Sequence, residues 1–310
     1  MNVKDVTWLS PYKLGDYQFF RQWATEAWEQ SGGLVHKELW LPWKLKMLIG
    51  KSGLVRRLPL IHPPRRLIVT VCGRPDYFCW PQCYGNEIVP IVWDCWPKYW
   101  EALVRFVRRN KTKTIFCTSS QTADMIRSRC PGCRAVWLPE GIKVDAYPMG
   151  GMLRDRPVDL LEIGRTMPKV AESIAAAKLA INYRRPSQGE LLFPDFAALT
   201  AGLRSAKLVV CYPRCDTNPE HAGKVETLTQ RYWECMLSGC LMVGRAPKEL
   251  VDFCGYNPVI ELGDSPAEKV TDVLARIGEF QDLVNRNRAF AERHADWSER
   301  IKKIREVLDA

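Results

Sequence analysis

The chain has 310 residues, of which 46% are hydrophobic and 26% are charged, a composition that excludes a disordered protein and suffices for two domains. No apolar run of about 18 residues occurs, and the start MNVKDVTWLS lacks the apolar centre of a secretory signal. We therefore expect a cytoplasmic protein, either free or peripheral at the inner face of the membrane. The net charge of +10 favours anionic partners.

The segment 37–66 interleaves Trp and Leu with basic side chains. Its basic residues are Lys37, Lys44, Lys46, Lys51, Arg56, Arg57, Arg65 and Arg66, against Glu38 alone. This mixture suits an anionic membrane surface, where rings lie at the headgroups and cations near phosphates. It equally suits a helix packed on its own domain whose lysines extend into solvent. A nucleic-acid groove is the third interpretation, since phosphates attract the same cations.

From Arg66 onward, short apolar runs alternate with amphipathic stretches, which is typical of β-α-β units and a parallel sheet. In the first half we expect strands at 67–73, 87–94, 112–120 and 133–141, with helices at 97–110 and 121–129. After Met149-Gly150-Gly151-Met152, predicted to be a flexible connection, the pattern restarts. In the second half we expect strands at 158–164, 207–213, 240–244 and 257–262, with helices at 168–180, 195–206, 227–238, 247–253 and 280–308.

These two successive halves predict an α/β protein with two Rossmann-like domains. We place the boundaries at 1–148 and 149–285, followed by a C-terminal helix at 286–310. Ligands of such sheets bind at the carboxyl ends of strands, here in the cleft between the halves.

The twelve cysteines do not predict a disulfide framework, because most of them lie inside apolar stretches. Cys130 and Cys133 form a Cys-x-x-Cys pair, but no second pair at zinc-ribbon spacing accompanies it. A structural zinc and a dithiol redox role are therefore minor alternatives to reduced cysteines used as small apolar side chains.

The most informative segment runs from His221 to Leu250. A polar loop leads into a helix predicted to start near Thr227. Glu226 directly precedes this helix, and Glu234 lies about two turns along it. The N-terminus of such a helix suits a diphosphate, and a carboxylate accepts two hydrogen bonds from a ribose diol. Two acidic residues on a solvated helix face would show the same spacing.

Glu226-x7-Glu234, followed by Ser238-Gly239 and an apolar run, resembles the Glu-x7-Glu element of retaining, group 1 GT-B glycosyltransferases. Lys248-Glu249-Leu250 resembles the Glu-Leu ending of that element. The motif Thr229-x-Arg231-Tyr232-Trp233-Glu234 resembles the corresponding sequence of the CgeB-like branch of this family. The motif His294-x-x-Trp297-x-x-Arg300 resembles the final helix of that branch. Pro139-Glu140-Gly141-Ile142 resembles the turn that closes the acceptor domain in this family. The likeness covers roughly residues 85 to 305.

The resemblance implies the GT-B fold, in which two domains face across a cleft and the C-terminal helix crosses back to the N-terminal domain. The first domain would bind the acceptor and the second the nucleotide-sugar. Glu234 would bind the donor ribose, Glu226 would lie near the donor sugar, and Arg165 would neutralise the leaving diphosphate. The other donor-binding residues would be Gly164, Lys169, His221, Gly223, Lys224, Thr227 and Arg231.

In the first half, Asp94 at the end of a strand is a candidate contact for the acceptor, or a cap of the next helix. Gly73, Arg74 and Asp76 share that position. The chain departs from the family in two respects. Thr227-Leu228-Thr229 replaces a Gly-Phe-Gly sequence, and neither His36 nor His62 follows a core strand where relatives often carry a histidine.

The expected reaction is transfer of a sugar, with retention and without a metal or other cofactor, because no convincing Asp-x-Asp motif is present. The expected partners are a nucleotide-sugar donor and an acceptor such as a glycan, a lipid-linked glycan or another cell-surface precursor. The alternatives are a DNA-base glycosyltransferase, which the charge keeps open, and a catalytically degenerate GT-B binding module. A nucleotide-sugar epimerase would need more acidic and histidine residues facing the sugar.

Overall fold

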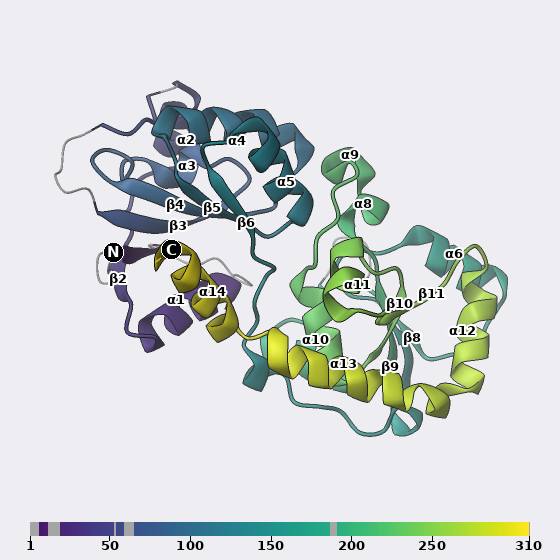
Figure 1. Ribbon diagram of the computed structural model, residues 1–310. Coiled ribbons are helices and arrows are strands. Elements are labelled where there is room, and N and C mark those ends of the chain that lie inside the picture. Colours follow the sequence, from purple (N-terminus) through teal and green to yellow (C-terminus); the bar gives the residue numbers. More distant parts are fainter. Residues whose placement is uncertain (1–5, 12–18, 53, 59–64, 187–190, 310) are drawn as a thin grey trace. The chain divides into compact units, whose positions relative to one another are not determined.

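The computed structural model describes residues 6–11, 19–52, 54–58, 65–186 and 191–309 (Figure 1). The chain forms two compact units that are not continuous in sequence. Unit 1 comprises Met1–Gly141, Glu220–Thr227 and Trp297–Ala310, and unit 2 comprises Ile142–Pro219 and Leu228–Asp296. The chain therefore passes into unit 2 and returns to unit 1 twice.

Unit 1 is built on a parallel sheet which, in the described residues, has six strands in the order β2-β1-β3-β4-β5-β6. The strands are β1 (Val6–Ser10), β2 (Leu34–Lys37), β3 (Arg66–Cys72), β4 (Glu87–Trp93), β5 (Thr114–Cys117) and β6 (Arg134–Trp137). The central strands β3 and β4 are buried on both faces, which explains their almost continuous apolar sequence.

Helices cover both faces of this sheet. They are α1 (Phe19–Gln30), α2 (Trp43–Ser52), α3 (Asp76–Cys79), α4 (Pro97–Asn110), α5 (Ser120–Arg129) and α14 (Trp297–Asp309). On one face, Trp28 of α1 and Trp297 of α14 pack with Trp8 of β1 in one core cluster. On the other, Leu103 of α4 and Ile126 of α5 pack with Val69 of β3 in a second cluster.

Unit 2 has a second parallel sheet whose described strands are ordered β11-β10-β9-β7-β8. The strands are β7 (Val158–Leu161), β8 (Tyr183–Arg184), β9 (Ala206–Cys211), β10 (Leu241–Gly244) and β11 (Val259–Glu261). Its helices are α6 (Pro168–Ala176), α7 (Phe196–Ser205), α8 (Arg214–Thr217), α10 (Gln230–Ser238), α11 (Lys248–Cys254), α12 (Pro266–Ala275) and α13 (Gln281–His294). The short α9 (Pro219–Ala222) spans the junction of the units, and 3-10 turns occur at Val144–Ala146, Leu153–Asp155 and Ile277–Phe280.

The predicted α/β class is confirmed, and from Arg66 to β11 the predicted strands and helices occur within a few residues of their expected ends. Helix α4 spans the predicted 97–110. Pro97 opens it with a φ suited to the first turn, and Lys111 ends it in the left-handed conformation. The predicted return of the C-terminal helix to the first unit is confirmed, since α14 belongs to unit 1.

The structure differs from the sequence expectations in several places. The β1-α1-β2 unit and β8 were not anticipated. The long C-terminal helix is broken at Ala295–Asp296, where the Ala295 carbonyl accepts a hydrogen bond from the Ile142 amide at 2.9 Å. The helix expected to start near Thr227 begins at Gln230 instead.

The Gly-rich stretch expected to be a connection lies inside unit 2. A Cβ atom on Gly150 would lie 2.5 Å from the carbonyl oxygen of Arg204, so this glycine is required by close packing. Of the helices in the described ranges, none combines the length and apolar character needed to cross a membrane.

Candidate functional site

The sheet of unit 2 reverses its direction of growth next to β7. From β7 the chain adds β8 on one side and then β9 on the other. In open α/β sheets, ligands bind outside the carboxyl ends of the strands at this point. Gly164 lies there, just beyond the end of β7, with φ +74 in the left-handed region where a side chain would be strained.

Glu162, directly after β7, fixes the loop that carries Gly164 and Arg165 through hydrogen bonds. This buried carboxylate accepts hydrogen bonds from the Met167 amide at 2.5 Å and from the Tyr183 hydroxyl at 2.7 Å. Burial and the neighbouring carboxylate raise the pKa of Tyr183 above its usual range, so the phenol stays a donor. Arg165 itself is exposed.

Helix α10 brings Glu234 to the same region. Tyr232 through Ser238 are buried, and Trp233 stacks on Phe290 of α13 with ring centroids 6.1 Å apart. Gly239 closes the helix in the left-handed conformation, as its small-Gly ending predicted. The aromatic packing and the cap together fix the position of the helix, and with it that of Glu234.

Glu234 is only 7% exposed and has two partners within unit 2. Its Oε1 accepts a hydrogen bond from the Tyr147 hydroxyl at 3.1 Å, and its Oε2 lies 2.7 Å from Arg231 Nη1. A Cβ atom on Gly164 would lie 3.9 Å from Arg231 Nη2, so the guanidinium reaches the loop after β7. The structure thus brings Gly164, Arg231 and Glu234 together.

The protonation states in this cluster follow from burial and charge. Burial first, and the Glu234 carboxylate second, raise the pKa of Tyr147 well above its usual range, so the phenol remains a hydrogen-bond donor. Burial by itself would lower the pKa of Arg231, but Glu234 together with Cys235, Cys211 and Tyr147 outweighs it, so the net direction is upward. Among the described residues, Arg231 Nη1 and Glu234 Oε2 make an ion pair without hydrogen-bond geometry. A buried acceptor in this condition calls for a further partner.

Lys169 has other contacts. From the first turn of α6 its Nζ lies 2.8 Å from Asp264 Oδ1 and donates to the Gly263 carbonyl at 3.2 Å. This hydrogen bond lowers the pKa of Asp264. Lys169 is therefore tied to the loop between β11 and α12.

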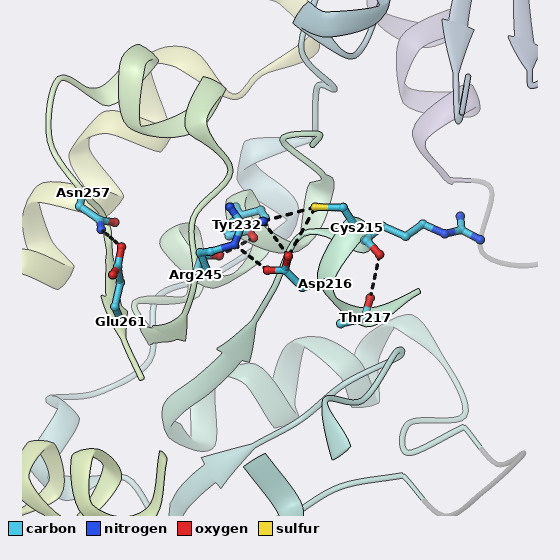
Figure 2. Close-up of polar contacts among 8 residues, drawn as sticks. Cys215, Asp216, Thr217, Tyr232, Arg245, Asn257 and Glu261 are labelled. Carbon is cyan, nitrogen blue, oxygen red and sulfur yellow. Dashed lines mark hydrogen bonds and ion pairs between the residues drawn. The ribbon is translucent and has the colours of Figure 1, made fainter. Parts of the chain in front are cut away.

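A third set of contacts joins the loops after β9 and β10 (Figure 2). Arg245, next to β10, makes a bidentate ion pair with Asp216 of α8, with distances of 2.6 and 2.8 Å. The Tyr232 hydroxyl of α10 donates to the Arg245 carbonyl at 2.9 Å. Bidentate pairs are geometrically specific, so this one holds two carboxyl-end loops of the sheet against α10.

The other predicted donor residues belong to unit 1. The loop Glu220–Thr227 packs against the first turns of α4 and α5, which follow the carboxyl ends of β4 and β5. Gln121 donates from Nε2 to the Lys224 carbonyl at 3.1 Å and accepts at Oε1 from the Glu226 amide at 2.7 Å. Ser119 Oγ donates to the Glu226 carbonyl at 3.2 Å. Both backbone groups of Glu226 are thus engaged by α5.

His221 of α9 and Gly223 in the loop after it contact the first turn of α4. The His221 Nδ1 atom is 2.7 Å from Lys98 Nζ, and its ring lies edge-on to Trp96 with centroids 6.2 Å apart. A Cβ atom on Gly223, at φ +58, would lie 3.2 Å from Pro97. The imidazole of His221 and the ammonium of Lys98 are thus within hydrogen-bond distance.

Asp94 ends β4 in the left-handed region at φ +48, a conformation uncommon for residues other than glycine and a form of strain that clusters at functional sites. Gly73 ends β3 at φ +76, and Arg74 donates to the Tyr77 hydroxyl at 3.3 Å. Asp76 is buried 3.8 Å from Arg109, and burial raises the pKa of its carboxyl despite that cation.

The predicted site residues therefore form two groups. Unit 2 holds Gly164, Arg165, Lys169, Arg231 and Glu234, and unit 1 holds Asp94, His221, Gly223, Lys224, Glu226 and Thr227. Sequence reasoning missed Tyr147, Gln121, Ser119, Lys98 and Arg245. None of them carries a local signal, because each meets its partner across more than ten positions of the chain.

His36 is exposed on β2, and His62 lies outside the described residues. Thr227 is buried ahead of α10 and not in its first turn, so the amides of 223–227 do not form the helix N-terminus as expected.

All twelve cysteines are free, and nine of them are buried. Burial raises the pKa of Cys95 and Cys133 to about 12, so these thiols are not nucleophiles at neutral pH. In the described ranges no three His, Cys, Asp or Glu side chains cluster as metal ligands. A cavity of about 360 Å³ in unit 1 lies between the end of α4 and the Cys130–Cys133 turn, and none of the predicted site residues lines it.

No protein-family model and no curated protein matches the sequence. Solved structures match its fold over nearly the whole chain. Sucrose-phosphate synthase from Thermosynechococcus elongatus is 11% identical with a TM-score of 0.65, covering 98% of each chain. HepE of Anabaena in complex with UDP-glucose is 11% identical with a TM-score of 0.60, covering 98% of this chain and 99% of that one.

The DNA-modifying enzyme β-glucosyltransferase is also 11% identical, with a TM-score of 0.55 over 98% of this chain and all of its own. At such identities the similarity establishes the fold. Two mostly parallel sheets with alternating helices, matched to these structures along nearly their full length, give this chain the two-domain α/β fold of the GT-B glycosyltransferases.

Proposed function

We propose that the protein is a glycosyltransferase that moves a sugar from a nucleotide-sugar donor to an acceptor hydroxyl. The observation that carries the proposal is the Glu234–Arg231–Gly164 cluster at the carboxyl end of β7, where α/β sheets bind nucleotides. HepE was crystallised with UDP-glucose and with UDP, which supports a nucleotide-sugar as the ligand class. The Glu-x7-Glu spacing adds the assignment to the retaining group 1 type and its CgeB-like branch.

Glu234 would accept hydrogen bonds from the ribose diol of the donor. Its Oε2 atom, which makes no hydrogen bond among the described residues, supplies the acceptor, and Tyr147 fixes the carboxylate through Oε1. Arg165, exposed beside Gly164, would neutralise the diphosphate together with the N-terminus of α10. Lys169 can assist only after leaving Asp264.

The reaction breaks the bond between the anomeric carbon and the diphosphate, and negative charge grows on the departing phosphate. Cationic and dipolar groups that are already in place lower this barrier. The acceptor hydroxyl attacks from the same face and its proton passes to the leaving diphosphate. No protein nucleophile or metal is required, and Glu226 and Asp94 are proposed to orient the sugar and the acceptor. The acceptor class we favour is a glycan, a lipid-linked glycan or another cell-surface precursor.

A DNA acceptor is the second candidate. It is favoured by the net charge of +10 and by the match to a DNA-modifying β-glucosyltransferase. Incubation of the protein with labelled donor and either duplex DNA or a glycan extract separates the two, since label is incorporated into only one. A catalytically degenerate module would bind the donor and label neither.

The donor assignment is tested by thermal unfolding with UDP-, GDP-, ADP- and TDP-sugars. A ligand at about 100 times its Kd stabilises the native state by about 2.7 kcal/mol, which raises the melting temperature. Glu234→Gln keeps an acceptor for Tyr147 but removes the charge, and should weaken binding about 10- to 100-fold. Glu172→Gln on the exposed surface of α6 is the matched control. Unchanged donor affinity in a folded Glu234→Gln variant would refute the assignment.

A further inference from the structure

Helix α2 in unit 1 buries one of its lysines and exposes two of its leucines. Lys46 is buried and forms an ion pair with Glu38, whose side chain is also almost covered. Leu45 and Leu48 are exposed, Leu48 by 65%. A helix of a globular protein normally buries its leucines and exposes its lysines. The outward face of α2 therefore carries apolar side chains beside its exposed lysines.

The exposed apolar surface extends beyond the helix on both sides. Six of the ten exposed large hydrophobic side chains among the described residues lie in this one segment. We call them the α2 patch: Leu39, Trp40, Trp43, Leu45, Leu48 and Leu54. Leu39 and Trp40 are 61% and 60% exposed. Isolated exposed leucines are ordinary, but six exposed large apolar side chains within one short segment indicate an interaction site.

The inner side of the patch is already packed. Trp43 lies edge-on to Tyr77 of α3, with centroids 5.6 Å apart, and α2 lies beside α3 (Figure 1). The contact of α2 with its own domain, which is one of the interpretations of the sequence, thus accounts for the buried face alone. The exposed face needs a different partner.

Positive charge accompanies the patch. Lys44 and Lys51 lie on the exposed side of α2 together with Leu48, and Lys37 and Arg56 flank it at either end. The only acidic residue between 37 and 58 is Glu38, which Lys46 neutralises. An occupant of this surface must therefore be apolar and negatively charged at once.

Charge and shape together select one occupant. A second copy of the chain, docked by two-fold symmetry on the same patch, would place lysines against lysines. Nucleic acid would satisfy the lysines and stack on the two tryptophans, but it offers nothing to the four leucines. We propose that the α2 patch binds the surface of an anionic lipid bilayer, with its rings and leucines below the headgroups and its lysines at the phosphates.

The test uses the full chain and vesicles of equal parts phosphatidylglycerol and phosphatidylcholine, with phosphatidylcholine alone for comparison. The wild type should float with the mixed vesicles and much less with the neutral ones. Leu45→Gln with Leu48→Gln should weaken this association by about tenfold or more, because two apolar anchors are lost. Lys44→Gln with Lys51→Gln should weaken it by about 30-fold on anionic vesicles alone.

Matched controls come from exposed residues elsewhere. Leu191→Gln removes a leucine that is about as exposed as Leu48, and Lys178→Gln with Lys302→Gln removes two exposed lysines outside the patch. Neither control should change flotation, and all variants should melt at the wild-type temperature because the substituted side chains are exposed. Lys46 is not substituted, because its removal would leave the Glu38 carboxylate without its ion-pair partner.

Three results would overturn the proposal. The first is a wild-type protein that floats with neither kind of vesicle. The second is a Leu45→Gln, Leu48→Gln variant that floats as the wild type does, and the third is a loss of flotation in the controls as large as in the patch variants. A chain that ignores vesicles but binds duplex DNA through Lys44 and Lys51 would assign the patch to nucleic acid instead. Because the readout is flotation, the result is independent of the proposed sugar transfer.

Discussion

Gln121 is the residue whose side chain engages the backbone of the Glu226 loop from both sides. Its amide donates to the Lys224 carbonyl and accepts from the Glu226 amide, which reproduces the pairing of a neighbouring strand. Ser119 engages the remaining Glu226 carbonyl. Because α5 is a regular helix packed in the unit 1 core, these contacts transmit its position to the loop.

Gln121→Ala is expected to lower turnover about tenfold, because two hydrogen bonds of about 0.5–1.5 kcal/mol each no longer position Glu226. The stability of the protein should change little, since Gln121 is exposed. Initial rates with saturating and limiting donor, alongside a melting curve, measure both effects. Asp124→Ala, exposed on the same helix, is the control. Wild-type rates in the Gln121→Ala variant would show that this contact does not position Glu226 for turnover.

At the scale of elements, two motifs far apart in sequence meet at the turn Pro139–Ile142. Trp297 of α14 packs so closely that a Cβ atom on Gly141 would lie 2.7 Å from its ring. Arg300 Nε donates to the Pro139 carbonyl at 2.9 Å, and Arg300 Nη2 donates to the Glu140 carbonyl at 3.3 Å. Trp297 and Arg300 of the His-x-x-Trp-x-x-Arg pattern thus support the fold of unit 1, whereas His294 packs on Phe253 and Phe290 of unit 2.

Gly141→Ala should destabilise the protein by about 1–3 kcal/mol, because the added methyl group overpacks against a buried ring. Urea unfolding measures the loss. In the Trp297→Ala background the same glycine substitution should cost less, since the ring it meets is gone. Gly132→Ala, with nothing within 4 Å of the added atom, is the neutral control. Equal losses in both backgrounds would contradict the contact.

For the whole molecule, the C-terminal helix completes unit 1. Trp297, Ile301 and Ile304 of α14 pack on the face of the sheet that carries Trp8. The last carbonyls of the helix accept hydrogen bonds from Arg66 at 3.1 Å and from Arg134 at 3.0 Å, two residues of the unit 1 sheet. Cations at a helix C-terminus are favourable. Unit 1 is thus closed by a segment that follows all of unit 2.

A chain ending at Asp296 should lose the cooperative unfolding of unit 1, because the truncation strips the apolar cover from one face of its sheet. Limited proteolysis followed by mass spectrometry should show cleavage throughout unit 1 while unit 2 stays protected. Removal of the two residues after Leu308 should leave the digest unchanged, because the core residues of α14 up to Leu308 are kept. A truncated chain as resistant as the full one would show that α14 is an appendage.

Much of the fold was predictable because its signals are local. The buried strands β3, β4, β9 and β10 are short apolar runs, and α4 begins with Pro97 at a position that favours a helix start. Glu234 was predictable because its helix and the Gly239 cap are local patterns. The predicted start of α10 was wrong by three residues. Thr227 is buried, and the Leu228 amide in the loop before the helix donates a hydrogen bond to the Glu249 carboxylate.

Other features had no local signal. The strand β1 contains Thr7 and Ser10 and becomes an interior strand of the sheet by pairing with β2 and β3, which lie further along the chain. The break at Ala295–Asp296 contains neither Gly nor Pro and results from contacts with Ile142 and Val144. Lys46 was grouped with the surface lysines by sequence alone, and the structure buries it on Glu38.

The sequence by itself determined most of the element types from Arg66 onward, the α/β class and the repeated half-pattern. These depend on periodicity and capping, which act over a few residues. Only the tertiary structure decided which unit each segment joins. It assigned 220–227 and 297–310 to unit 1, and gave Glu234 its partner Tyr147 from 87 positions earlier. The physical reason is that burial of apolar surface is non-directional, so a local pattern says that a face must be covered but not which distant segment covers it.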